Sequence, residues 1–81
     1  MIVSINYKDR QGDGYDSRKY SYLCGIPDIR VGDKVIAPTY KGNRDAVVVE
    51  VDVPLGCIDL DIIPKLRTIT QRIKEEGTDG K

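Results

Sequence analysis

The sequence predicts a mostly β protein, either a small antiparallel β-barrel or a strongly bent sheet of about five strands. Three observations predict this class. Val and Ile supply 18 of the 81 residues whereas Leu, Ala and Met supply seven, and β-branched side chains pack better on a pleated surface than in a helix. Several segments alternate apolar and polar residues, and clusters of Gly, Pro and Asp separate them. A chain this short buries one small core, so we expect a single domain over residues 1–75.

The first two expected strands are separated by a long polar stretch. Residues 1–7 and 19–24 both alternate in the manner of a half-buried strand. The residues between them are polar and include glycines, which predicts a surface loop or the wide tip of a hairpin. Residues 25–33 then contain the turn-forming types Gly, Pro and Asp, and we expect Ile29 and Val31 to anchor this turn to the core.

The next two expected strands, residues 34–40 and 46–53, form a predicted hairpin. Pro38 indicates an edge or a bulge in the first of them, because proline has no N–H to donate to a neighbouring strand. The tip has the sequence Lys-Gly-Asn-Arg, in which Gly42 or Asn43 can adopt a positive φ. In the second strand the odd-numbered valines share one face, and we expect that face to line the core.

Residues 59–76 fit two different structures. A helix is indicated by apolar residues at helical spacing, namely Ile62, Leu66, Ile69 and Ile73. The β-branched run at residues 68–70 favours a strand instead. We expect a strand near 67–73, preceded by a short turn or helical piece around 62–65, with the helix as the alternative. The last residues, 76–81, have nothing to bury and are expected to form a disordered tail.

Part of the chain resembles a known pattern of small β-barrel domains. An extended strand of the form VGDxVxVP, a short tip and a VVxV strand have counterparts at residues 32–39, at Gly42 and at residues 46–51. Residues 20–24 and 69–73 fit the same group. The chain thus resembles small β-barrel domains of phage and prophage proteins of unassigned role. It is more distantly similar to the amino-terminal, 3′-DNA-end-binding domain of the primosomal replication-restart helicase, and KOW and SH3-like barrels share the same pattern.

The resemblance implies that the protein works beside DNA. It implies a small phage-like accessory module that binds single-stranded or 3′-ended DNA, or that sits beside proteins that do. It implies no helicase activity, because the sequence contains no Walker A motif. The resemblance does not assign a DNA-end-binding role to any individual residue of this chain.

Tyrosines lie next to cations at two places in the sequence. Tyr15 and Tyr20 flank one cationic pair, and the predicted hairpin tip contains the other group. An aromatic ring beside cations suits single-stranded nucleic acid, because bases stack on the ring while the cations contact phosphates. The candidate nucleic-acid-binding residues are Arg18, Lys19, Tyr40, Lys41 and Arg44.

Two other interpretations of these residues stay open. Exposed cations at hairpin tips also keep strand edges soluble, and Tyr40 can instead close one end of the barrel. The net charge of zero does not give the basic excess that is typical of nucleic-acid-binding domains. An alternative function is a protein-interaction or assembly module, without nucleic-acid binding, whose edge strand near Pro38 pairs with a partner protein or with a second copy of the chain.

The sequence offers little for catalysis or for metal binding. It contains no His, which removes most imidazole chemistry and the usual zinc sites. Asp59 and Asp61 are a close acidic pair in an apolar setting, but helix capping explains them equally well. We therefore expect no enzymatic activity, no metal and no cofactor.

Cysteine usage and apolar run length indicate the compartment. Cys24 and Cys57 are 33 positions apart and do not form the disulfide framework of a small secreted domain, so we expect two half-buried free thiols. No apolar run approaches the length of a membrane-spanning helix or of a signal-peptide core. The expectation is a soluble, cytoplasmic protein without a membrane partner.

Overall fold

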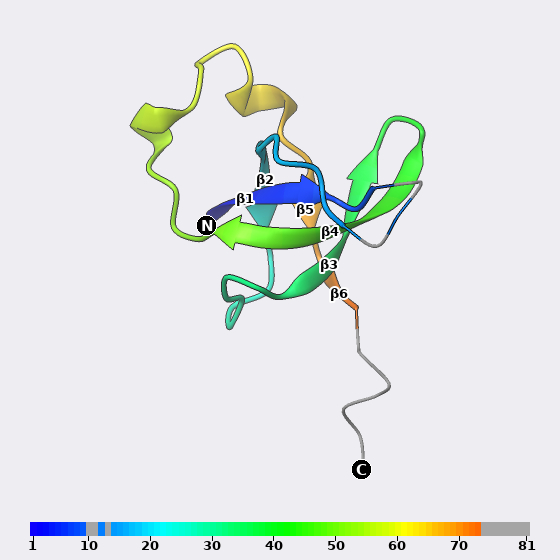
Figure 1. The fold of residues 1–81 in the computed structure, drawn as a ribbon. Helices are drawn as coiled ribbons and strands as arrows, with labels where there is room; N and C mark the ends of the chain where they lie inside the picture. Colours follow the sequence, from blue (N-terminus) through cyan, green and yellow to red (C-terminus); the bar gives the residue numbers. More distant parts are fainter. Residues whose placement is uncertain (10–11, 13, 74–81) are drawn as a thin grey trace.

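A computed structural model describes residues 1–9, 12 and 14–73 of the chain. The predicted tail at 76–81 lies outside the described residues. Within them the chain forms β-strands and two short 3-10 helices, with no α-helix (Figure 1). In chain order the elements are β1 (Ile2–Tyr7), β2 (Tyr20–Cys24), β3 (Lys34–Thr39), β4 (Gly42–Glu50), η1 (Leu55–Cys57), η2 (Ile63–Lys65), β5 (Thr68–Ile69) and β6 (Gln71–Arg72).

The strands form one sheet that bends almost into a closed barrel. Its order is β5-β2-β1-β4-β3-β6, with antiparallel pairing throughout except between β2 and β5, which run parallel. Only Thr70 separates β5 from β6. One short segment therefore pairs with both edges of the sheet, as Figure 1 shows where β5 and β6 cross behind β3 and β4. The predicted fold class is confirmed.

The ambiguous C-terminal stretch is a strand preceded by a helical turn, as expected. The 3-10 helix η2 covers 63–65, and the strand pairing begins at Thr68. Pro64 occupies the first turn of η2, and Leu66 is already extended, so a longer helix does not form. The side chain of Ile69 is fully buried, which explains why this segment closes the barrel rather than lying on its surface.

The core lies inside the bent sheet and draws on every strand except β6. Its fully buried members come from four different strands, so no single hairpin can fold around it alone. Burial of this kind is the main favourable term in folding. The buried cluster consists of Val3, Ile5, Tyr7, Tyr22, Cys24, Ile29, Val35, Ala37, Ala46, Val48 and Ile69.

The inward face of β4 is opposite to the one predicted. Ala46 and Val48 face the core at 0% and 1% exposure, and Val47 and Val49 lie half-buried on the outer face. Val51, just beyond the strand, is half-buried and packs against the core. The physical reason is the register with β1, where Val48 pairs beside fully buried Ile5. The strand also ends earlier than expected, because Asp52 adopts a φ of 51° just after Glu50.

The turn between β2 and β3 is anchored by one of the two residues expected to do so. Ile29 is buried in the core, but Val31 is 60% exposed, so that prediction was wrong. Gly32 takes a φ of 97° and donates its N–H to the carbonyl of Val48 at 2.8 Å. This reversal directs Val31 away from the core, where it lines a shallow hollow with residues 49–54 and Cys57.

An ion-pair cluster ties the closing segment to that turn. The Arg72 guanidinium donates to the Asp28 carboxylate at 2.9 Å and lies 3.5 Å from the Asp33 carboxylate. The hydrogen bond from Arg72 lowers the pKa of the Asp28 carboxyl below its ordinary value. Asp33 also accepts the backbone N–H of Arg30 at 2.9 Å, so its carboxylate holds the turn in addition to contacting Arg72.

Pro38 lies where β3 has a neighbour on one side only. It pairs with Asn43 of β4, while the ladder from β3 to β6 covers only Val35 and Ile36. The expected edge position is therefore confirmed. The hairpin beside it is tighter than predicted, because β4 already begins at Gly42, which takes a φ of 119°.

Candidate functional site

Three tyrosines come together at one end of the barrel. Tyr20 and Tyr22 are two positions apart on β2 and so point to the same face, and the pairing of β2 with β1 brings them beside Tyr7. The ring centroid of Tyr7 lies 4.5 Å from that of Tyr20 and 6.4 Å from that of Tyr22, the latter edge-to-face. This contact places a rigid aromatic surface at the open end of the core.

A chain of hydrogen bonds fixes two of these rings. The Tyr22 hydroxyl donates to the carbonyl oxygen of Pro38 at 2.9 Å. Because the Tyr22 hydroxyl has only this one proton to donate, the Tyr7 hydroxyl is the donor in its 2.5 Å contact with the Tyr22 oxygen. Burial is the largest cause that raises the pKa of the Tyr22 hydroxyl, and the proximity of Tyr7 acts in the same direction. Tyr22 therefore stays neutral and connects β2 to the base of the hairpin.

The hairpin between β3 and β4 presents a fourth tyrosine to solvent. Tyr40 is 81% exposed at the tip, which does not fit the alternative that it closes the barrel. The Nζ atom of Lys41 lies 5.6 Å from the centroid of the Tyr40 ring. The tip is held by Thr39, whose hydroxyl donates to the Gly42 carbonyl and accepts the N–H of Lys41.

Arg44 connects this hairpin to the tyrosine cluster. Its guanidinium carbon lies 4.4 Å from the centroid of the Tyr7 ring, a cation–π contact. The same guanidinium donates to the backbone carbonyl of Lys8 at 3.2 Å. Arg44 thus covers Tyr7, so the rings open to a ligand are those of Tyr20 and Tyr40.

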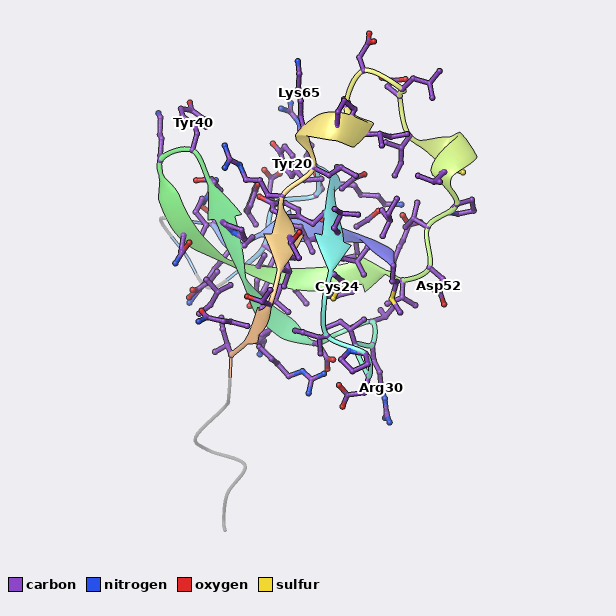
Figure 2. All side chains as sticks on the ribbon, turned by 180° about the vertical axis from the view of Figure 1, so that it is seen from behind. Tyr20, Cys24, Arg30, Tyr40, Asp52 and Lys65 are labelled. Carbon is purple, nitrogen blue, oxygen red and sulfur yellow. The ribbon has the colours of Figure 1, made fainter. Side chains whose placement is uncertain are left out.

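Two adjoining hollows lie over these residues, and together we call them the tyrosine groove. The first has a volume of about 340 Å³ and the second about 290 Å³. Figure 2 shows Tyr20 between the hairpin that carries Tyr40 and the turn that carries Lys65, the two walls of the groove. Besides the tyrosines and Thr39, the lining residues are Lys19, Ser21, Lys41, Arg44, Ile62, Lys65, Leu66 and Arg67.

The groove carries positive charge. Among the described residues, five cations and no Asp or Glu line the two hollows. One of these cations, Lys19, is paired with a carboxylate. Its Nζ lies 3.1 Å from the Glu50 carboxylate and lowers the pKa of that carboxyl. The other four cations have no carboxylate partner among the residues that the structure describes. A protein of zero net charge thus concentrates cations on one surface.

Most of the residues predicted from the sequence line this groove. Tyr40, Lys41 and Arg44 line the first hollow, and Lys19 lines the second. The two separate tyrosine-cation groups of the sequence therefore meet in one place. Arg18 is exposed but lines neither hollow.

Several lining residues were not predicted from the sequence, among them two tyrosines and two cations. Tyr7 and Tyr22 were assigned to strands without a role, although their alternation already placed them on the core-facing side. Lys65 and Arg67 come from the segment whose structure was ambiguous. No local signal shows that this segment crosses back beside β2, where the Arg67 carbonyl accepts the N–H of Leu23 at 2.9 Å.

The remaining candidate residues form no second site. Cys24 and Cys57 are both free thiols, but Cys24 is buried and Cys57 exposed, so neither is half-buried as expected. Asp59 and Asp61 are exposed in a turn, and the first residue capping η2 is Ile62 rather than an aspartate. Within the described ranges, no group of three His, Cys, Asp or Glu side chains could hold a metal ion.

Comparison with known proteins adds no relative. Neither the family models, nor the curated proteins, nor the solved structures contain a match to this chain. Among the described residues, no helix has the length and apolar character needed to cross a membrane.

Proposed function

We propose that the protein is a small nucleic-acid-binding module that holds single-stranded DNA in the tyrosine groove. The observation that carries the proposal is the coincidence of exposed tyrosine rings with cations that have no carboxylate partner among the described residues. Single-strand-binding surfaces combine these two features, because stacking tolerates any base while cations track the phosphate backbone. The groove supplies both on one surface of a protein whose net charge is zero.

Each wall of the groove takes a different part of the strand in this proposal. The 81% exposed ring of Tyr40 stacks on a base, an interaction that contributes about 1–3 kcal/mol per base. Lys41 and Arg44 on the hairpin, with Lys65 on the opposite wall, contact phosphates. Bases of a duplex are paired inside the helix and cannot reach these rings, so the strand bound is single.

The resemblance described above supports the same direction. Residues 32–39 and 46–51, which carry it, form most of the β3–β4 hairpin that presents Tyr40. A phage-like accessory module beside DNA-processing proteins is the setting that it suggests. No catalytic step is part of the proposal, because the groove contains no acidic residue, histidine or cysteine among its described lining residues.

The alternative of an edge strand that pairs with a partner protein has weaker support. The unpaired part of β3 contains Pro38, which offers no N–H. Its carbonyl already accepts the Tyr22 hydroxyl. Both backbone groups at the centre of that edge are therefore unavailable for β-strand addition.

Fluorescence anisotropy with a labelled 12-nucleotide oligothymidylate tests the proposal. We expect binding that weakens as the salt concentration rises from about 50 to 200 mM. The logarithm of the binding constant plotted against the logarithm of the salt concentration should have a slope of about −0.7 for each phosphate contacted. A matching duplex should bind more weakly. Tyr40→Ala should reduce affinity by about 5- to 150-fold, the range that stacking energies imply.

Arg30→Met is the matched control, because Arg30 is exposed and lies at the opposite end of the molecule from Tyr40 (Figure 2). It removes one positive charge without touching the groove, so affinity should remain near the wild-type value. Absence of binding at tens of micromolar protein in low salt would refute the proposal. Equal loss in Arg30→Met and Lys41→Met would also refute it, since binding would then depend on total charge.

A further inference from the structure

The tyrosine groove is divided into two hollows that share one cation. Tyr7, Tyr20, Tyr22 and Arg67 line both of them. Among the described residues, Lys41 and Arg44 line only the first hollow, and Lys19 and Lys65 only the second. Within the described part of the chain, Arg67 is therefore the one cation at the boundary between the two hollows.

The size of each hollow suits one nucleoside. Volumes of about 340 and 290 Å³ lie near the lower end of the range of about 300–1,000 Å³ found for small-molecule sites. The first hollow offers the exposed ring of Tyr40, and the second offers an apolar wall of Ile62 and Leu66 beside Tyr20. Each hollow thus has its own apolar surface for one base.

Arg67 is held beside both hollows. Its backbone carbonyl accepts the N–H of Leu23 at 2.9 Å, which fixes its Cα beside β2. Its side chain is exposed and pairs with no carboxylate among the described residues. By contrast, Arg72 is occupied by two aspartates. A planar guanidinium with free donors matches a phosphate in a bidentate geometry.

We infer that the groove takes two successive nucleotides, one base in each hollow, and that Arg67 binds the phosphate that joins them. The inference rests on the proposed function and deepens it. It assigns to Arg67 a position-specific contact, whereas Lys41 and Lys65 contact flanking phosphates. The effect of an Arg67 substitution on affinity should therefore depend on the charge of one phosphate linkage and not on the total charge of the strand.

The test compares thymidylyl-thymidine having a normal phosphodiester with the same compound having a neutral methylphosphonate linkage. Both compete against labelled 12-nucleotide oligothymidylate for the wild-type protein, for Arg67→Met and for Lys41→Met. We expect the neutral linkage to weaken wild-type binding by about tenfold or more, because a charge-assisted hydrogen bond is lost. Arg67→Met should bind both compounds equally, whereas Lys41→Met should still discriminate between them. Arg67→Lys keeps the charge without the planar fork and should restore part of the discrimination.

The outcomes separate this inference from the proposed function. If the labelled oligonucleotide does not bind, the proposed function fails. If it binds but thymidylyl-thymidine does not compete, two nucleotides do not make up the site and the inference is wrong. The inference is also wrong if Arg67→Met still prefers the phosphodiester as strongly as the wild type does. Thermal unfolding of each variant verifies that the fold is retained.

Discussion

The hydroxyl of Tyr22 receives a hydrogen bond from Tyr7 and passes one on to the carbonyl of Pro38. Through these two bonds, side chains from β1 and β2 hold the outer part of β3, where the strand has no neighbour on its β6 side. The same two rings form the floor of the tyrosine groove. Folding and the proposed binding surface therefore share one pair of residues.

Tyr22→Phe should destabilise the fold by about 0.5–1.5 kcal/mol at neutral pH, because the Pro38 carbonyl loses its partner. The variant should also change the response to alkaline pH. The pKa of Tyr22 is raised in the folded protein above its ordinary value of 10.0. The contribution of the neutral Tyr22 hydroxyl to the free energy of unfolding is therefore fully present below pH 10 and is lost as the pH rises further. Urea unfolding of the wild type should show this loss, at most about 1.4 kcal/mol per pH unit.

The comparison of the two proteins isolates that effect, since other titrating groups are common to both. The stability difference between wild type and Tyr22→Phe should be constant between pH 7 and about 9. It should shrink above pH 10. A difference that stays constant across the alkaline range would show that Tyr22 is not held neutral by the fold.

Val48→Thr and Val47→Thr together test which face of β4 is buried. Val48 is 1% exposed in the core, whereas Val47 is only half-buried on the outer face. Placing a hydroxyl at position 48 without a partner should cost about 1–3 kcal/mol, and the same change at 47 should cost clearly less. Unfolding midpoints in urea measure both variants. A larger loss of stability in Val47→Thr than in Val48→Thr would show that β4 has the orientation expected from the sequence.

Gly32→Ala should destabilise the turn before β3. Gly32 has a φ of 97°, a conformation that costs an L-residue about 1–2 kcal/mol. Gly56→Ala is the matched control, because Gly56 lacks a positive φ and a Cβ there would meet no atom within 4 Å. The control should be neutral or slightly stabilising. Thermal unfolding should rank Gly32→Ala below both wild type and the control, and equal midpoints would contradict the account of this turn.

Much of the fold was predictable because the strands are short, β-branched and separated by strong turn formers. The orientation of β4 was not, because residues 46–49 are all apolar, and a continuous apolar run does not distinguish its two faces. Pairing with β1 determines which face of β4 is buried, and the paired residues are about 40 positions apart in the sequence. The prediction that Val31 anchors the turn to the core was wrong for a related reason, since the positive φ of Gly32 reverses the direction of the chain there.

The candidate site was predictable only where its residues are neighbours in sequence. Tyr40 and Lys41 stand side by side in the chain, so the amino-acid sequence alone displays their pattern. Arg67 had no such signal, because its position depends on the parallel pairing of β5 with β2. That pairing places its charge opposite the hairpin from which Arg44 extends.

Nuclear magnetic resonance gives the most direct test that the tyrosine groove binds single-stranded DNA. Unlabelled 12-nucleotide oligothymidylate is titrated into ¹⁵N-labelled protein, and backbone amide shifts are followed residue by residue. The account predicts saturable changes concentrated at 19–22, 39–44 and 65–67, which line or flank the groove. No changes, or changes confined to the outer hollow at Val31 and Val53, would contradict it.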